Sequence, residues 1–212
     1  MNEIHKTDRL AEGAPEDLEL RDRLVTGAVR LFAARGYAAV SVREICAAAG
    51  ATKPMLYYYF GSKEGLYNHL IESVYEGFLT LLSEVEAQRL PLRQALVRYA
   101  EAHLRWAQEA PDHARLVFAN ALGPLDSPGE ERPNVHRLAV DRLSQLIAAD
   151  QGPEAAIPAV DLTLSFIGAV VLACLRFLSL ELDEPLAAAE RAAAVVETFL
   201  AGARAQGGLR CA

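Results

Sequence analysis

A short segment between residues 50 and 66 concentrates side chains that can bind phosphate. Three consecutive tyrosines, Tyr57, Tyr58 and Tyr59, stand between two of the chain's three lysines, Lys53 and Lys63. A phenol hydroxyl and an ammonium group both donate hydrogen bonds to phosphate oxygens. Three consecutive helical residues cannot share one face, so at least one hydroxyl must stay exposed. The segment therefore predicts a phosphate-gripping surface, with core aromatics as the alternative for the tyrosines.

Two short helices separated by a glycine are predicted to position these groups. Ser41 and Glu44 are spaced as a capping box that opens the first helix, and Gly50 is expected to end it in a left-handed conformation. Thr52 is expected to cap the second helix, with Pro54 in its first turn, where a missing N–H costs little. Such a pair of helices can place its second member in a DNA groove.

The second helix also needs a face that packs inward and a turn that leads into the next helix. Leu56 and Phe60, four residues apart, are predicted to point inward, and Ser62 is expected to cap a third helix whose free N–H groups could meet a phosphate. The candidate DNA-contacting residues of the segment are Ser41, Arg43, Thr52, Lys53, Pro54, Met55, Tyr57, Tyr58, Tyr59 and Lys63.

Three of these candidates have ordinary structural alternatives. Lys63 could be a solvated lysine at a helix start, but a cation is unfavourable near a helix N-terminus, which favours a role in binding. Arg43 could simply decorate the surface, and Met55 could be a packing residue. Lys53 is better placed for contact, because it stands at the entry of the second short helix.

A longer pattern of residue types at fixed spacing surrounds these helices. It consists of Ala28, Leu31, Phe32, Gly36, Tyr37, Ser41, Val42, Ile45, Ala49, Gly50, Leu56, Tyr57, Tyr58, Tyr59, Phe60, Ser62, Lys63, Glu64 and Leu66. Residues 24–67 thereby resemble the DNA-binding domain of the TetR/AcrR family of bacterial transcriptional repressors. Cys46 departs from the usual alanine, and Gly61 from the usual charged or polar residue. The resemblance implies a homodimeric regulator that binds a palindromic operator and is released by a small apolar or amphipathic inducer.

The charge distribution agrees with contact to DNA at one end of the chain. The whole chain has a formal net charge of −7. Residues 20–70 hold seven basic and three acidic side chains, a net of +4, so the remainder carries −11. A basic module attached to an acidic body suits a protein that touches DNA with one part only.

Composition and periodicity predict an all-α fold. The chain has 212 residues, of which 52% are hydrophobic, with alanine and leucine runs and little β-branched alternation. We expect helices at 18–35, 63–87, from Pro91, from Pro111, and at about 135–149, 158–182 and 185–205, with a loop at 123–134. The predicted division is a flexible tail at 1–17, a helix-turn-helix DNA-binding domain at 18–66 and a helical ligand-binding and dimerisation domain at 67–212.

The last two helices suggest how the body assembles. Residues 160–180 are apolar almost all round, and the final helix keeps an alanine-rich face with Val195, Val196, Phe199 and Leu200. A helix apolar on every side must be covered on every side. Pairing both helices with their copies would give a four-helix interface, which is how the family dimerises; a simple intrachain core is the alternative.

Aromatic residues in the body are candidates for a ligand cavity. At helical spacing they are more often core, but the resemblance implies an inducer site between the body helices. Arg176 interrupts an apolar run, and a buried charge needs a partner. It could pair across the dimer or anchor a ligand carboxylate. The candidate ligand-binding residues are Tyr99, His103, Trp106, Phe118, Phe166 and Arg176.

Other functional classes find little support. Cys46, Cys174 and Cys211 lack metal-ligand spacing, so we expect neither a metal nor a cofactor, and their odd number without a signal peptide indicates the cytoplasm. The longest uncharged apolar stretch, 162–175, is shorter than the roughly 18 residues of a membrane span, which favours a buried helix. No HExxH, glycine-rich phosphate loop or GxSxG motif suggests an enzyme. An interaction protein that has lost DNA binding is a further alternative, which the intact lysine and tyrosine set disfavours.

Overall fold

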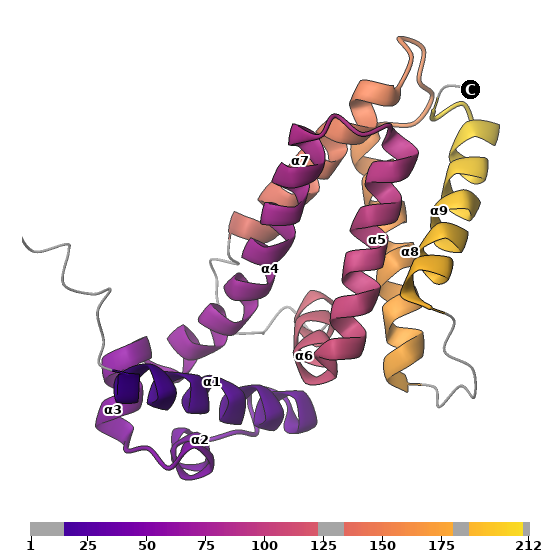
Figure 1. Cartoon of the computed structure of the whole chain (residues 1–212). Helices are drawn as coiled ribbons and strands as arrows, with labels where there is room; N and C mark the ends of the chain where they lie inside the picture. The colour runs from indigo at the N-terminus through magenta and orange to yellow at the C-terminus, as the bar shows by residue number, and fades with distance from the viewer. Residues whose placement is uncertain (1–14, 123–133, 180–186, 210–212) are drawn as a thin grey trace, which may run out of the picture. The chain divides into compact units, whose positions relative to one another are not determined.

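The computed structural model describes residues 15–122, 134–179 and 187–209, and these ranges contain helices and no strand (Figure 1). The predicted all-α fold class is therefore confirmed. The helices are α1 (Pro15–Arg35), α2 (Val42–Ala49), α3 (Lys53–Phe60), α4 (Lys63–Ala87), α5 (Leu92–Glu109), α6 (Pro111–Leu122), α7 (Asn134–Asp150), α8 (Ala159–Ser179) and α9 (Ala188–Ala205).

The first helix begins earlier than predicted. It starts at Pro15, so the assignment of residues 15–17 to a flexible tail is wrong. Proline favours the first helical turn, because its fixed φ suits the helix and its missing N–H is not needed there. The predicted tail at 1–14 and nearly all of the predicted loop, 123–133, lie outside the described residues.

The chain divides into two compact units, with the boundary between Leu70 and Ile71. This boundary falls inside α4 and lies close to the predicted division after residue 66. In the first unit α1 packs against α2 and α3. Its core consists of buried side chains from α1 to α4, chiefly Leu20, Leu24, Ala28, Val29, Phe32, Val40, Ile45, Leu56, Leu66, Tyr67 and Leu70.

The second unit is a bundle in which α5 contacts α6, α7, α8 and α9, and α8 contacts α6, α7 and α9 (Figure 1). Val196 and Leu200 of α9 are buried in this chain's own core, so the expectation that they belong to an interface between two chains is wrong. Phe199 packs against Phe166 with ring centroids 5.2 Å apart. The inner face of α9 is therefore accounted for within one chain.

The outer side of α8 remains uncovered. Val160, Leu164 and Leu172 are among the exposed large hydrophobic residues, and Leu172 is 67% exposed. The window Ala159–Arg176 is long and apolar enough to cross a membrane by length and composition, and 28% of it is buried. Core helices of the same composition meet that criterion too, and the inner side of α8 packs against α5, α6, α7 and α9.

Candidate nucleic-acid interface and body cavity

The N-terminus of α2 is capped by reciprocal hydrogen bonds between Ser41 and Glu44. The Ser41 hydroxyl accepts a bond from the Glu44 amide, and the Glu44 carboxylate accepts bonds from the Ser41 amide (2.8 Å) and hydroxyl (2.7 Å). Arg35 Nη1 also donates to Glu44, at 2.7 Å. The bonds from Ser41 and Arg35 lower the pKa of Glu44 to about 2. The predicted capping box is confirmed, and it occupies the Ser41 side chain.

The turn between α2 and α3 places the second helix. Gly50 has φ +63°, a conformation that side-chain-bearing residues rarely adopt, as the sequence predicts. Thr52 is the N-cap residue of α3, but its side chain makes no capping hydrogen bond, so that part of the expectation is wrong. Its hydroxyl is exposed and stays available to a ligand.

One face of α3 is buried and the other is bare. Leu56 is fully buried and anchors the helix, while Phe60 is half-buried, 5.5 Å from the His69 ring. Tyr58 is 79% exposed and Tyr57 47% exposed. Tyr59 is half-buried and packs edge-on against Tyr58. The exposed candidate residues of α2 and α3, with the N-cap residue Thr52, are called here the α3 face: Arg43, Thr52, Lys53, Pro54, Met55, Tyr57 and Tyr58.

Lys63 is held by aromatic rings at the start of α4. Its Nζ lies 3.9 Å from the Tyr37 ring centroid and 6.0 Å from that of Phe32, within range of a cation–π interaction. Desolvation lowers the pKa of Lys63, against an opposing pull from the Glu44 carboxylate. The rings fix the position of a cation that would otherwise swing freely, a feature that the sequence pattern did not reveal.

The turn between α3 and α4 contains a steric constraint that the sequence did not indicate. Ser62 caps α4, as predicted, by accepting a bond from the Gly65 amide at 2.9 Å. Gly61 has φ +72°, and the Ser62 amide donates to the Phe60 carbonyl at 2.8 Å. A Cβ atom on Gly65 would lie 2.0 Å from that carbonyl oxygen. Gly65 therefore permits the close approach that sets where α3 ends.

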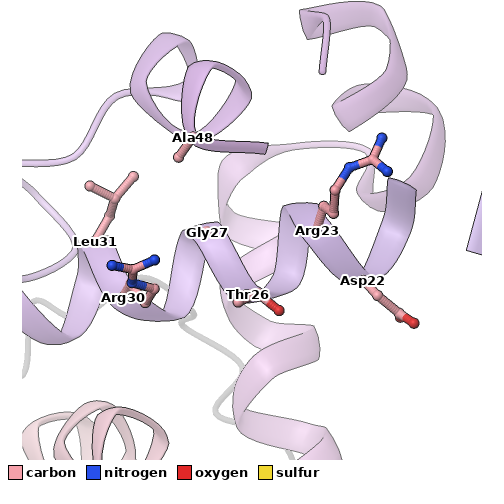
Figure 2. A pocket seen from close by; sticks show the side chains of 7 residues that line it. All are labelled: Asp22, Arg23, Thr26, Gly27, Arg30, Leu31 and Ala48. Carbon is pink, nitrogen blue, oxygen red and sulfur yellow. The ribbon is translucent and has the colours of Figure 1, made fainter. Parts of the chain in front are cut away.

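A groove of about 650 Å³ lies between α1 and α2, and no residue of α3 lines it. Figure 2 shows Leu31 and Ala48 pointing towards one another across it, with Arg23 and Arg30 extending from α1. Arg23 Nε donates to the Ala49 carbonyl at 3.2 Å, which caps the C-terminal end of α2. The groove is therefore the space between two packed helices, and one of its arginines, Arg23, has a structural role.

The body contains a small, mainly apolar cavity of about 60 Å³. Four of the predicted ligand-binding residues, Tyr99, His103, Trp106 and Phe118, line it. Phe166 does not line it, although its ring centroid lies 6.0 Å from that of Tyr99. The remaining lining residues are Tyr75, Phe78, Val117, Ala139, Val140, Ile167, Val170 and Val171.

Arg176 and Cys174 differ in their surroundings. Arg176 lies in the last turn of α8, is exposed in a single chain and is not among the cavity-lining residues, so it does not line the predicted ligand site. It stands four residues after Leu172, on the side of α8 that a single chain leaves exposed. Cys174 is fully buried, and desolvation raises the pKa of its thiol to about 12. Cys174 is therefore a core residue and not a reactive thiol.

Comparison with known proteins agrees with this geometry. The sequence model of the family described as "Bacterial regulatory proteins, tetR family" matches residues 24–70. The transcriptional activator FasR of Mycolicibacterium smegmatis is 28% identical over 148 residues, which are 70% of this chain and 67% of FasR. The transcriptional repressor NicS of Pseudomonas putida is 36% identical over 58 residues, and the match spans 27% of each chain.

A solved structure extends the likeness to the body. The TetR family regulator PfmR of Thermus thermophilus superimposes with a TM-score of 0.66 at 23% identity, covering 85% of this chain and 98% of PfmR. At that identity the likeness concerns the fold. The relatives are named as transcriptional regulators, which confirms the prediction that this chain is not an enzyme. The matched helix-turn-helix and the shared fold together support a DNA-binding transcriptional regulator that resembles the TetR family.

Proposed function

We propose that the chain is a homodimeric repressor that leaves its operator when a small molecule enters the body cavity. The observation that carries the DNA-contact part is the α3 face, because these side chains protrude while Leu56 holds the helix in place. Lys53 and Met55, near the N-terminal end of α3, meet base edges in the major groove.

Phosphate contacts flank this base-reading end. Tyr58 carries the most exposed of the three hydroxyls, and the cation of Lys63 is pre-positioned on the Tyr37 ring. Both groups donate hydrogen bonds to phosphate oxygens without reading sequence. Tyr57, Thr52 and Arg43 provide further exposed donors on the α3 face. Ser41 acts through the capping box rather than through a free hydroxyl.

The uncovered face of α8 supports the dimer. Val160, Leu164 and Leu172 recur at four- and eight-residue intervals, so they share one side of the helix. Exposed large apolar side chains gathered on one face indicate an interaction surface. A second copy of the chain is the occupant that a palindromic operator requires, because two half-sites are read by two symmetry-related helices.

The dimer is tested with two matched charge substitutions. Leu172→Glu places a carboxylate on the α8 face, where an isolated chain tolerates it because Leu172 is 67% exposed. Leu138→Glu makes the same change on α7, at a residue that is 48% exposed. Light scattering should show monomers for the first variant and dimers for the second. Dimers of unchanged affinity for both variants would contradict the proposed interface.

The ligand part of the proposal is supported by the aromatic cavity. An inducer releases DNA only if it binds the DNA-incompetent state more tightly than the DNA-bound state. Helix α4 contributes Tyr75 and Phe78 to the cavity lining and also begins at Lys63, so it connects both functions along one element. A shift of α4 on ligand entry would alter the separation of the two DNA-reading helices.

A helix-turn-helix protein without a small-molecule ligand is the competing function. The cavity volume of about 60 Å³ favours it, since ligand pockets usually have about 300–1,000 Å³. Trp106 separates the two functions, because it lines the cavity and is the chain's one tryptophan. Under the sensor proposal, Trp106→Ala keeps operator binding but no longer releases DNA on induction. Absence of ligand-induced release in the wild type would favour the competing function, whereas release that Trp106→Ala leaves unchanged would place the ligand site outside this cavity.

A further inference from the structure

The cavity in the body has an unusual combination of burial and polar groups. None of its lining residues carries a carboxylate, an ammonium or a guanidinium. The lining residues whose side chains carry a polar group are Tyr75 and Tyr99 with hydroxyls, His103 with its imidazole and Trp106 with its indole N–H. His103 is 8% exposed and Tyr99 is 5% exposed, so both lie almost entirely inside the body.

The protonation of His103 follows from its hydrogen bond. Nδ1 lies 2.8 Å from the Tyr99 carbonyl oxygen, which can only accept, so Nδ1 carries the proton. Burial lowers the pKa of His103 to about 4, against a smaller rise from this hydrogen bond. The ring is therefore neutral at physiological pH, and Nε2 carries a lone pair.

The orientation of the imidazole is fixed as well. Its ring stacks on Phe78 with centroids 3.5 Å apart and an angle of 6° between the planes. The Tyr99 ring lies on another side, at 4.2 Å between centroids. Within the described part of the chain, neither His103 Nε2 nor the Tyr99 hydroxyl makes a hydrogen bond. His103 Nε2 is therefore an oriented acceptor to which a hydroxyl hydrogen can be donated.

We propose that the cavity binds an uncharged, mainly apolar molecule that carries a hydroxyl group, whose hydrogen is accepted by Nε2 of His103. The proposal rests on the proposed ligand-responsive function and narrows the class of ligand. The aromatic and aliphatic walls from Phe78, Trp106 and Val170 cover the rest of such a molecule.

The same geometry rejects anions. A carboxylate would face the Nε2 lone pair, and the lining offers it only neutral hydroxyl and indole donors and no cationic side chain. Burying an ionised group without a partner is strongly unfavourable. An ether of the same shape would fill the cavity but has no hydroxyl hydrogen to donate to Nε2 of His103. The cavity therefore distinguishes three ligands of similar size by a single functional group.

The small volume sets the size of the probe. About 60 Å³ holds roughly two water molecules, so the lining must move outward even for a six-membered ring. The edge-on packing of Trp106 against Phe78 (5.4 Å) and Phe118 (6.0 Å) would change as the lining moves. Trp106 emission therefore reports entry directly, and saturated ring compounds do not absorb where indole is excited.

The experiment titrates the full chain with cyclohexanol, methoxycyclohexane and cyclohexanecarboxylate, followed by Trp106 fluorescence. Cyclohexanol should bind about fivefold to tenfold more tightly than the ether, the effect of one buried hydrogen bond, and the carboxylate should not bind. His103→Phe keeps an aromatic ring against Phe78 but deletes the acceptor, so alcohol and ether should then bind equally. His103→Gln restores an acceptor and should restore part of the preference.

His113→Phe is the matched control, because His113 lies on α6 outside this cavity and should leave the preference intact. If wild type binds the ether or the carboxylate as tightly as cyclohexanol, the inference fails while ligand response stands. If His103→Phe is folded by circular dichroism and still prefers the alcohol, the inference also fails. If wild type binds none of the three, both the inference and the ligand part of the proposed function fail, whereas operator binding is unaffected.

Discussion

Gly65 gives the sharpest test of how α3 is positioned. In Gly65→Ala the new Cβ would lie 2.0 Å from the Phe60 carbonyl oxygen and 3.2 Å from its carbon. Ordinary contact begins at 3.4 Å, so the backbone at the end of α3 must move by about 1.4 Å or α4 must yield by the same amount. A carbonyl cannot rotate away as a flexible side chain can, because Phe60 is part of the helix that it terminates.

Two opposing effects decide the magnitude. Replacing glycine by alanine favours a helix by up to about 1 kcal/mol. Overpacking a filled site costs about 1–3 kcal/mol. The clash should win, giving a net loss of about 1–2 kcal/mol in the free energy of unfolding. Operator affinity should fall further, since each well-made base contact is worth about 1–3 kcal/mol and depends on where α3 lies.

Urea denaturation and fluorescence anisotropy on operator DNA measure the two effects separately. Gly77→Ala is the matched control on the same helix, because a Cβ there meets nothing within 4 Å. That variant should be as stable as wild type or more stable by about 0.5–1 kcal/mol, with unchanged operator affinity. A Gly65→Ala protein that behaves like Gly77→Ala would refute the proposed turn geometry.

Three further predictions concern single side chains. Lys63→Ala should weaken binding about equally on operator and random DNA and reduce the salt slope by about one; an unchanged slope would remove its phosphate role. Lys53→Ala should cost about 1–3 kcal/mol and blur one symmetric base pair per half-site in a selection from random DNA, so an unaltered sequence preference would exclude base contact. The pKa of Glu44 is lowered to about 2 from 4.5, so its stabilisation is full above pH 4.5 and is lost as the pH falls towards 2. Glu44→Gln should lack that part of the acid dependence in denaturation midpoints, and an identical pH profile would contradict it.

The helix-turn-helix could be predicted from the sequence because its signals are local. The capping box at Ser41, the left-handed Gly50 and the Ser62 cap each depend on residues a few positions apart. The exposure of Tyr57 and Tyr58 followed from helical geometry, which cannot bury three consecutive tyrosines on one face. These features need no knowledge of the rest of the chain.

What the sequence could not supply depends on residues that meet across the fold. The cation–π contact of Lys63 requires Tyr37, and the tautomer of His103 requires the direction of the Tyr99 carbonyl. Arg176 could not be placed because an almost wholly apolar run does not reveal which side of its helix a single chain leaves exposed. Val196 was assigned to an interface between chains because its pattern shows an apolar face of α9 but not which partner covers that face.

The central claim is that two copies of this chain read a symmetric DNA site with α3. Selection from a random DNA library, followed by titration of the selected site at several salt concentrations, tests it most directly. The account predicts a palindrome whose half-site centres lie about one helical turn apart, bound by a dimer with an affinity that falls steeply with salt. Recovery of no preferred sequence, or of one asymmetric half-site bound by a single chain, would contradict it.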